Sequence, residues 1–175
     1  KTIAVAGTHG KSSTTALLAH VLIEGGLDPM ALVGAAVPAW GGHHARVGNG
    51  EYFVVEADEY RRHFLNFQPT HALITTIDFD HPDYFDSKEA VARAYASFLR
   101  LVPASGVVVT GEEVKRQFEE LPWPTTTVTV AGGDAAGQAM PLPGEHMHYN
   151  ASLAAAMAQK LGLPWPDIVR HIATF

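Results

Sequence analysis

Cysteine is absent from the 175-residue sequence, so neither disulfide bonds nor thiolate-bound metals can contribute to the fold. No apolar stretch approaches the roughly 20 residues that span a bilayer, and the N-terminal residues lack the features of a signal peptide. Basic residues are few, since 12 lysines and arginines stand against 18 acidic residues. We therefore expect a soluble, cytoplasmic protein with no membrane partner and, without a basic surface, no nucleic-acid partner.

Hydrophobic residues make up 47% of the sequence and charged residues 17%, a composition that fits one compact domain with its own core. A strand pattern begins at Lys1 itself, with no initiating methionine or leader before it. We therefore expect residues 1–175 to be a single domain excised from a longer protein.

Short apolar runs alternate with stretches of helical period, which predicts an α/β fold with a mostly parallel sheet flanked by helices. The expected strands are residues 3–6, 31–33, 52–56, 72–77, 107–110 and 126–130. Helical faces are expected at Leu17, Leu18, Val21 and Leu22, and at Val91, Tyr95, Phe98 and Val102, with Ser87 as the cap of the second helix. Further helices are expected at 112–121, at 150–161 and from Pro166 toward Ile172. Residues 131–144 are expected to form a loop or a short hairpin.

A glycine-rich loop, Gly7-Thr8-His9-Gly10-Lys11-Ser12-Ser13, joins the first expected strand to the first expected helix. Glycines at 7 and 10 let backbone N–H groups turn inward, and the helix N-terminus adds partial positive charge where phosphates sit. We expect Lys11 to reach the β- and γ-phosphates of ATP and Ser12 to offer its hydroxyl oxygen to Mg²⁺.

This loop predicts a fold similar to that of the P-loop NTPases. The full Walker spacing would place a glycine at position 5, which is Val5, so the loop is a shortened variant. An ordinary strand-to-helix turn that carries Gly-Lys-Ser is the alternative, and the strand before the loop and the helix after it make that alternative the less favoured one.

Two expected strands end in acidic residues at the sheet edge where open α/β proteins bind ligands. The first ends in Glu56-Ala57-Asp58-Glu59, and Glu56 is the best candidate to hold Mg²⁺ against the phosphates. The second leads into Asp78-Phe79-Asp80-His81-Pro82-Asp83, where carboxylates flank His81 and could fix its tautomer or share a metal. Without the phosphate loop, a solvated acidic turn would be the preferred interpretation of Glu56.

Ten histidines make a zinc site a tempting interpretation. The helical His-x-x-x-His pattern and the cysteine pairs that would supply tight zinc ligands are both missing, so magnesium with mixed ligands fits better. His43, His44 and His171 are expected to be ordinary surface residues.

Three segments occur in the order Gly7-Thr8-His9-Gly10-Lys11, Glu56-Ala57-Asp58-Glu59-Tyr60-Arg61-Arg62-His63-Phe64-Leu65 and Ile77-Asp78-Phe79-Asp80-His81-Pro82-Asp83-Tyr84-Phe85. Together they resemble the Mur ligases, the ATP-dependent enzymes that assemble the peptide stem of peptidoglycan. His9 is similar to the branch that joins L-alanine to UDP-N-acetylmuramate and to its close relative, the murein tripeptide-recycling ligase. Residues 60–63 are most similar to the alanine-adding branch. The resemblance covers essentially the whole chain but only the central ATP-binding domain of a three-domain family, so an N-terminal UDP-binding domain and a C-terminal domain would flank it.

A fourth segment, Gly144-Glu145-His146-Met147-His148-Tyr149-Asn150, is similar to the family's Gly-x-His-Asn-x-x-Asn segment, which opens a helix and contacts adenine. The resemblance assigns contacts with ATP to His146 and Asn150. Met147 replaces the family's frequent asparagine, so we expect that contact to be lost or to move to His148 or a backbone group. Thr76 also stands where the family usually has asparagine.

In the reaction that the resemblance implies, the carboxylate of UDP-N-acetylmuramate attacks the γ-phosphate of ATP, and L-alanine then attacks the acyl phosphate. The first step joins two anions and requires charge neutralisation. Lys11 would hold the phosphates, Ser12 and Glu56 one Mg²⁺, and His81 a second. Arg61, Arg62 and His63 could contact substrate or could be surface residues. Without flanking domains, we expect the chain to bind ATP weakly and not to turn over.

Three other functions remain open at this point. A murein tripeptide ligase of peptidoglycan recycling would attach a preformed peptide to the same sugar nucleotide. A P-loop small-molecule kinase would need an acceptor pocket and a lid within this chain. In a non-catalytic nucleotide-binding module, Glu56 and His81 would be merely structural.

Overall fold

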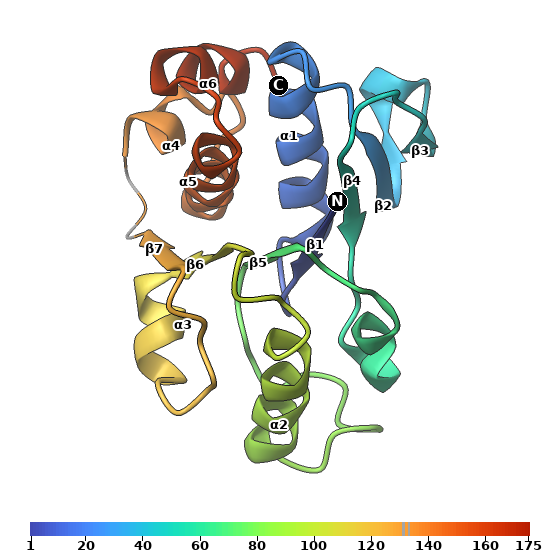
Figure 1. Ribbon diagram of the computed structural model, residues 1–175, viewed down its shortest axis with the longest axis vertical. Coiled ribbons are helices and arrows are strands. Elements are labelled where there is room, and N and C mark those ends of the chain that lie inside the picture. Colours follow the sequence, from blue (N-terminus) through green and yellow to red (C-terminus); the bar gives the residue numbers. More distant parts are fainter. Residues whose placement is uncertain (131, 133) are drawn as a thin grey trace.

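The computed structural model describes residues 1–130, 132 and 134–175, which form one layer of sheet between two layers of helices (Figure 1). Within these residues the sheet has seven strands in the order β3-β2-β4-β1-β5-β6-β7. Their bounds are β1 Thr2–Ala6, β2 Met30–Val37, β3 His43–Arg46, β4 Phe53–Glu56, β5 His71–Ile74, β6 Val108–Gly111 and β7 Thr127–Val130. The β2–β3 pair is antiparallel and the other pairs are parallel, so the predicted fold class is confirmed.

Helices lie on both sides of the sheet (Figure 1). One side carries α1 Lys11–Glu24, α4 Ala135–Ala139, α5 Glu145–Lys160 and α6 Trp165–Ile172, and the other carries α2 Lys88–Leu99 and α3 Glu112–Gln117. Two 3-10 segments, η1 Pro38–Trp40 and η2 Tyr60–Asn66, follow β2 and β4. In the described part of the chain, no helix has the length and apolar character that crossing a membrane would require.

The central strand β1 is buried on both faces. Ile3 and Val5 belong to the core on the side of α1 and α5, whereas Ala4 and Ala6 belong to the core on the side of α2. This alternation follows from the strand geometry, which turns successive side chains to opposite faces. Continuous apolar strands are typical of parallel sheets covered on both faces. Burying one large apolar side chain in such a core stabilises the fold by about 1.5–3 kcal/mol.

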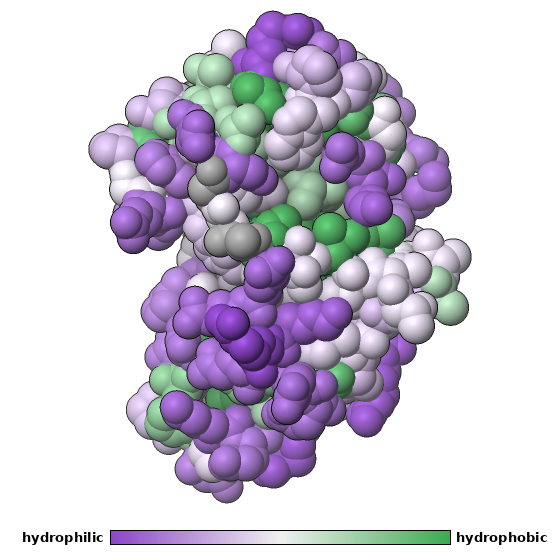
Figure 2. All heavy atoms as spheres, turned by 90° about the vertical axis from the view of Figure 1, so that its left-hand side faces the viewer, coloured by the Kyte–Doolittle hydropathy of each residue, from purple (hydrophilic) through white to green (hydrophobic). Residues whose placement is uncertain are grey.

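Some apolar side chains remain at the surface. Met30 and Leu32 on β2 are 41% and 43% exposed. The alternate residues Ala31 and Val33 are buried. One face of this strand therefore lacks a covering helix. Figure 2 views the opposite end of the sheet from β2, where hydrophobic residues lie across the middle and in the upper half of the face and the lower half is largely hydrophilic.

Local sequence explains where several helices begin. Ser87 Oγ accepts a hydrogen bond from the Ala90 N–H at 3.2 Å, so the predicted cap of α2 is confirmed. Asp134 caps α4 in the same way, by accepting from the Gly137 N–H at 2.8 Å. Helix α5 is buried at every position from 150 to 158, where alanines predominate. Small side chains allow α1 to pack closely against it.

The edge strand β3 is absent from the sequence-based prediction. Its residues are exposed or half-buried, so the apolar pattern that marks the other strands is missing there. His43 and His44 lie on this edge and are exposed, as expected of surface residues. Strand β2 runs on to Val37 to pair with it, beyond the predicted end at 33.

Other predicted boundaries are also wrong. Strand β5 ends at Ile74 and not at 77, because the next residues turn to bind the glycine-rich loop. Helix α3 ends at Gln117, short of 121, and α5 begins at Glu145, before 150. The loop predicted at 131–144 contains helix α4, which the Asp134 cap starts; Ala131 and Gly133 lie outside the described residues.

Phe64 anchors η2 to the core, where its ring stacks on Phe98 at 4.7 Å and meets Tyr95 edge-on at 5.3 Å between centroids. We expect Phe64→Ala to lower the free energy of unfolding by about 3–5 kcal/mol, because it leaves a cavity among buried rings. Urea denaturation followed by circular dichroism measures the change. Leu101→Ala, at a side chain that is 40% exposed, is the control and should cost about 1 kcal/mol or less. Equal losses in the two variants would contradict the assignment of Phe64 to the core.

His71 joins β5 to the residue that precedes β6, because its Nδ1 accepts a hydrogen bond from the Val107 N–H at 3.0 Å. Burial lowers the pKa of the His71 imidazole below its ordinary value of 6.5. The neutral ring therefore contributes stability that is full above pH 6.5 and is lost as the pH falls through the lower folded pKa. We expect His71→Asn, which keeps an acceptor but cannot titrate, to lose less stability than the wild type between about pH 7.5 and 5. Urea denaturation at several pH values measures the free energy of unfolding of both proteins. If that free energy changes equally with pH in the wild type and in His71→Asn, the expectation is wrong.

Candidate functional site

Three loops meet at the carboxyl edge of the sheet. Strands β4, β1 and β5 are neighbours and parallel, so the segments that follow them leave the sheet at the same edge. The glycine-rich loop follows β1, the acidic turn at 56–59 ends β4, and residues 75–81 follow β5. Their convergence at one edge creates the candidate site.

The glycine-rich loop is held by the residues after β5. The Thr8 N–H donates to the Thr76 carbonyl and the His9 N–H to Thr76 Oγ1, both at 2.9 Å. Thr8 Oγ1 in turn accepts from the Asp78 N–H at 2.9 Å. Threonine at position 76 therefore binds the loop through its hydroxyl group.

Two glycines allow this path. Gly7 has a φ of 141°, and a Cβ added there would overlap Thr75. Gly10 has a φ of 80° at the N-cap of α1, and a Cβ there would lie 2.8 Å from Asn150 Oδ1. The left-handed conformation and the close approach together require glycine at position 10.

The start of α5 lies against the loop. Asn150 is only 4% exposed, and its side chain lies where a Cβ at position 10 would meet it, so the structure brings it to the predicted site. The Tyr149 hydroxyl donates to the Thr75 carbonyl at 3.0 Å, and burial raises the pKa of this phenol to about 12. His146 is exposed, with its ring beside Gly144, and Met147 is buried.

Ser12 and Glu56 are in direct contact. Ser12 Oγ donates to Glu56 Oε2 at 2.8 Å, and the Gly34 N–H donates to the same oxygen at 2.6 Å. The structure thus pairs two of the residues that the sequence analysis assigns to a metal. A hydroxyl and a carboxylate this close offer oxygen ligands of the kind that a hard cation prefers.

Lys11 is paired with a carboxylate that the sequence analysis did not select. Its Nζ lies 2.8 Å from Glu59 Oε2 and 3.8 Å from Asp58 Oδ1. The Glu59 side chain is 3% exposed, whereas that of Asp58 is 47% exposed. The sequence pattern favours Glu56 because it is the last residue of the strand. Asp58 and Glu59 look alike in the sequence, so no sequence signal singles out Glu59.

His81 lies near two carboxylates, those of Glu59 and Asp80. Its Nε2 lies 4.0 Å from Glu59 Oε1 and 3.9 Å from Asp80 Oδ2. His81, Asp58 and Glu59 each offer one possible ligand atom, and these three atoms lie within 4.8 Å of one another. This arrangement could hold a metal ion. Asp58 and Glu59 are therefore the acidic residues with which His81 could share a cation.

The acidic turn also acts on the core beneath it. Burial raises the pKa of the Tyr95 phenol well above its ordinary value of 10, and the charges of Glu59 and Asp58 raise it further. This phenol therefore stays neutral beneath the carboxylates.

The remaining predicted residues lie at the rim of the site. The His9 side chain is 71% exposed, 4.0 Å from Asp78 Oδ2. Arg61 and Arg62 are exposed and have left-handed backbone conformations, with the Arg61 guanidinium 5.4 Å from the centre of the Tyr60 ring.

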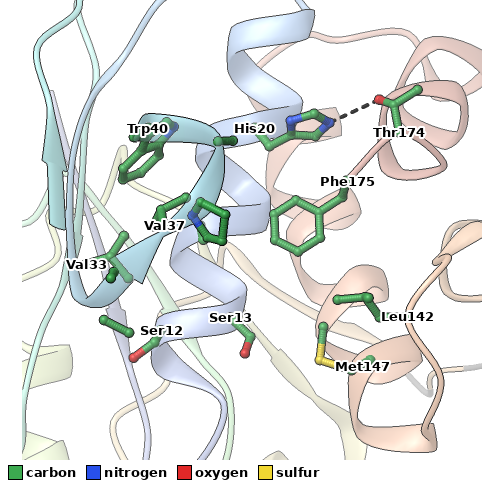
Figure 3. A pocket seen from close by; sticks show the side chains of 15 residues that line it. Ser12, Ser13, His20, Val33, Val37, Trp40, Leu142, Met147, Thr174 and Phe175 are labelled. Carbon is green, nitrogen blue, oxygen red and sulfur yellow. Dashed lines mark hydrogen bonds between the residues drawn. The ribbon is translucent and has the colours of Figure 1, made fainter. Parts of the chain in front are cut away.

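A cavity of about 540 Å³ adjoins Ser12 and Ser13 (Figure 3). Its walls come from β2 and η1 on one side and from α5 and the chain end on the other. The side chains of Val33, Val37, Trp40, Leu142, Met147 and Phe175 make it mainly apolar (Figure 3). An uncharged ring system could enter it next to the start of α1.

These features define an α/β domain of the P-loop type. They are a central strand, a glycine-lined loop, a lysine and a serine at the start of a helix, and a carboxylate on the adjacent strand. Residues 5–132 match the family model described as the Mur ligase middle domain. The chain belongs to the Mur ligase family.

Two curated relatives share the name UDP-N-acetylmuramate–L-alanine ligase. The protein of Halorhodospira halophila is 38% identical over 201 residues, which cover 99% of this chain and 41% of the relative. That of Desulfitobacterium hafniense is 33% identical over 198 residues, with 99% and 44% covered. The chain therefore spans less than half the length of these relatives.

Solved structures have the same fold. A UDP-N-acetylmuramate:L-alanyl-gamma-D-glutamyl-meso-diaminopimelate ligase from Neisseria meningitides matches with a TM-score of 0.86 and 26% identity, covering 99% of this chain and 65% of that one. A UDP-N-acetylmuramate-alanine ligase from Thermotoga maritima matches with a TM-score of 0.81 and 24% identity, covering 100% and 45%.

Gly10→Ala tests the close approach of the loop and α5. Gly26 is a matched control, because its φ of 77° is close to the 80° of Gly10 but a Cβ there meets nothing within 4 Å. Both variants incur the left-handed strain of about 1–2 kcal/mol. We expect Gly10→Ala to lose about 1 kcal/mol more in urea denaturation, because of the contact with Asn150. The extra loss should shrink in an Asn150→Ala background, and equal losses at the two glycines would rule out the contact.

Proposed function

We propose that this chain is the central ATP-binding domain of a three-domain ligase that joins L-alanine to UDP-N-acetylmuramate in the cytoplasm. The contact between Ser12 and Glu56, beside Lys11 at the start of α1, carries the proposal because it suits magnesium and nucleotide phosphates. The names of the relatives at 33% and 38% identity support the choice of substrates.

The loop has the chemistry to bind the phosphates of ATP. Helix α1 directs its N-terminus to the loop, and Gly7 and Gly10 remove the side chains that would block an approaching phosphate. Lys11 supplies the cation that attracts the β- and γ-phosphates. Thr8, His9 and Ser13 complete the loop, and Asn150 with His146 would lie toward the nucleoside.

The residues for magnesium also fit. Ser12 and Glu56 would hold one Mg²⁺, and the cluster of His81 with Asp58 and Glu59 would hold a second. Glu59 Oε1 is buried and, among the described residues, has no hydrogen-bond partner, as expected of an oxygen reserved for a cation. Bound magnesium would neutralise charge between phosphate and carboxylate oxygens.

The proposed chemistry begins with two anions. The carboxylate of UDP-N-acetylmuramate takes the γ-phosphoryl group of ATP, giving an acyl phosphate and ADP, and the amine of L-alanine then displaces phosphate to form the amide. The contribution of this domain is to align the phosphates and to reduce their charge, through Lys11 and the loop N–H groups. The flanking domains would supply the sugar-nucleotide and amino-acid sites.

A tripeptide ligase is the second candidate, because the structure of the diaminopimelate-containing peptide ligase matches with a TM-score of 0.86. Its identity of 26% is lower than the 33–38% of the two alanine ligases described above. The choice of amino acid is therefore the point that an assay must decide.

The test is ADP release by the longer protein that carries this chain between its flanking domains. We expect release to depend on both UDP-N-acetylmuramate and L-alanine. Glu56→Gln should lower kcat about 100-fold or more, because an amide binds Mg²⁺ poorly. Glu51→Gln is the control, since Glu51 is an exposed surface partner of Lys1. The 175-residue chain alone should bind ATP weakly and release no ADP.

Other outcomes identify the alternatives. Release that requires the tripeptide in place of L-alanine would indicate the recycling ligase. Release with a small acceptor and no UDP-sugar would indicate a kinase. A Glu56→Gln protein with full function would indicate a binding module.

A further inference from the structure

Glu59 occupies an unusual position for a carboxylate beside a phosphate site. It is 2% exposed, and its Oε2 accepts a hydrogen bond from Lys11 Nζ at 2.8 Å. The Lys11 side chain is itself only 13% exposed. In this structure the cation of the loop is therefore already neutralised by a buried negative charge.

A ligand phosphate and Glu59 compete for the same ammonium group. An approaching polyphosphate must draw Nζ away from Glu59 or share it, and it meets the negative charge of the carboxylate in either case. Burial strengthens this opposition, because little solvent screens a charge that is almost completely enclosed. Asp58 opposes binding less, since its oxygen is 3.8 Å from Nζ and its side chain is 47% exposed.

In the pair of Glu59 and Lys11, the carboxylate is the enclosed partner. Glu59 lies between the buried residues Ala57 and Phe64, and the Phe64 ring is fixed by Tyr95 and Phe98. The Glu59 side chain is 3% exposed and is therefore enclosed by the surrounding residues. Lys11, at the first position of α1 on a flexible stem, is the partner that can move.

We propose that Glu59 is a positioning residue that holds Lys11 in the nucleotide-free chain and thereby weakens polyphosphate binding. Ligands with a single phosphate group cannot displace the carboxylate, whereas a triphosphate can. The loop is in this way selective for a highly charged ligand and releases it readily. The inference rests on the proposed function of the loop as a phosphate site.

Binding of ATP and of inorganic triphosphate to the 175-residue chain, both without Mg²⁺ and measured by isothermal titration calorimetry, tests the competition; magnesium is left out because Glu59 is also proposed to help hold it. Glu59→Gln keeps the shape and a hydrogen-bond acceptor but removes the charge. We expect it to bind both ligands about tenfold more tightly, because a charge-assisted hydrogen bond no longer opposes them. Glu51→Gln, at an exposed carboxylate paired with Lys1, is the control and should change the affinity by about threefold or less. A merely structural role for Glu59 would instead weaken binding.

The dependence on Lys11 separates competition from general electrostatics. Lys11→Gln should weaken binding, and adding Glu59→Gln to it should restore far less than tenfold, because the competing pair no longer exists. If Glu59→Gln does not fold, as judged by circular dichroism, Glu59→Asp replaces it. That variant draws the carboxylate back from Nζ and should also tighten binding.

Two failures can be told apart. Unchanged or weaker binding by the folded Glu59 variant, with Lys11→Gln still weakening it, overturns the competition and leaves the phosphate site intact. Triphosphate binding that is insensitive to Lys11→Gln, or absent from the wild type, overturns both proposals.

Discussion

The central position of β1 is the constraint on which the site depends. β1 pairs with β4 on one side and β5 on the other, all in parallel, so the segments after these three strands must meet at one edge. That edge receives the glycine-rich loop, the acidic turn and residues 75–81. The apolar, double-sided burial of β1 therefore determines where the polar groups of the site gather.

Packing on the two faces of the sheet positions two parts of the site, the glycine-rich loop and the acidic turn. On one face α5 brings Asn150 against Gly10, and its alanines let it lie close to α1. On the other face, Phe64 in the aromatic cluster with Tyr95 holds the acidic turn against the end of β4. The glycine-rich loop and the carboxylates are thus supported by separate cores, so damage to one need not displace the other.

The site combines charges that oppose one another. Lys11 is paired with Glu59, while Ser12 is paired with Glu56, so these four groups already have internal partners. Such pairs satisfy buried groups in the nucleotide-free chain, where unpaired charges would be costly. They also mean that ligand binding is an exchange of partners.

The sequence by itself determined the fold class, the place of the glycine-rich loop between strand and helix, the cap at Ser87 and the meeting of Ser12 with Glu56. These follow from local period, glycine placement and strand polarity. It could not identify β3, whose edge residues have no apolar alternation, or α4, whose start depends on the Asp134 cap. The tertiary structure alone decided that Lys11 pairs with Glu59 and that His81 faces Glu59 and Asp58. Burial decided these contacts: two adjacent acidic residues look alike in a sequence, and only packing distinguishes the enclosed carboxylate from the solvated one.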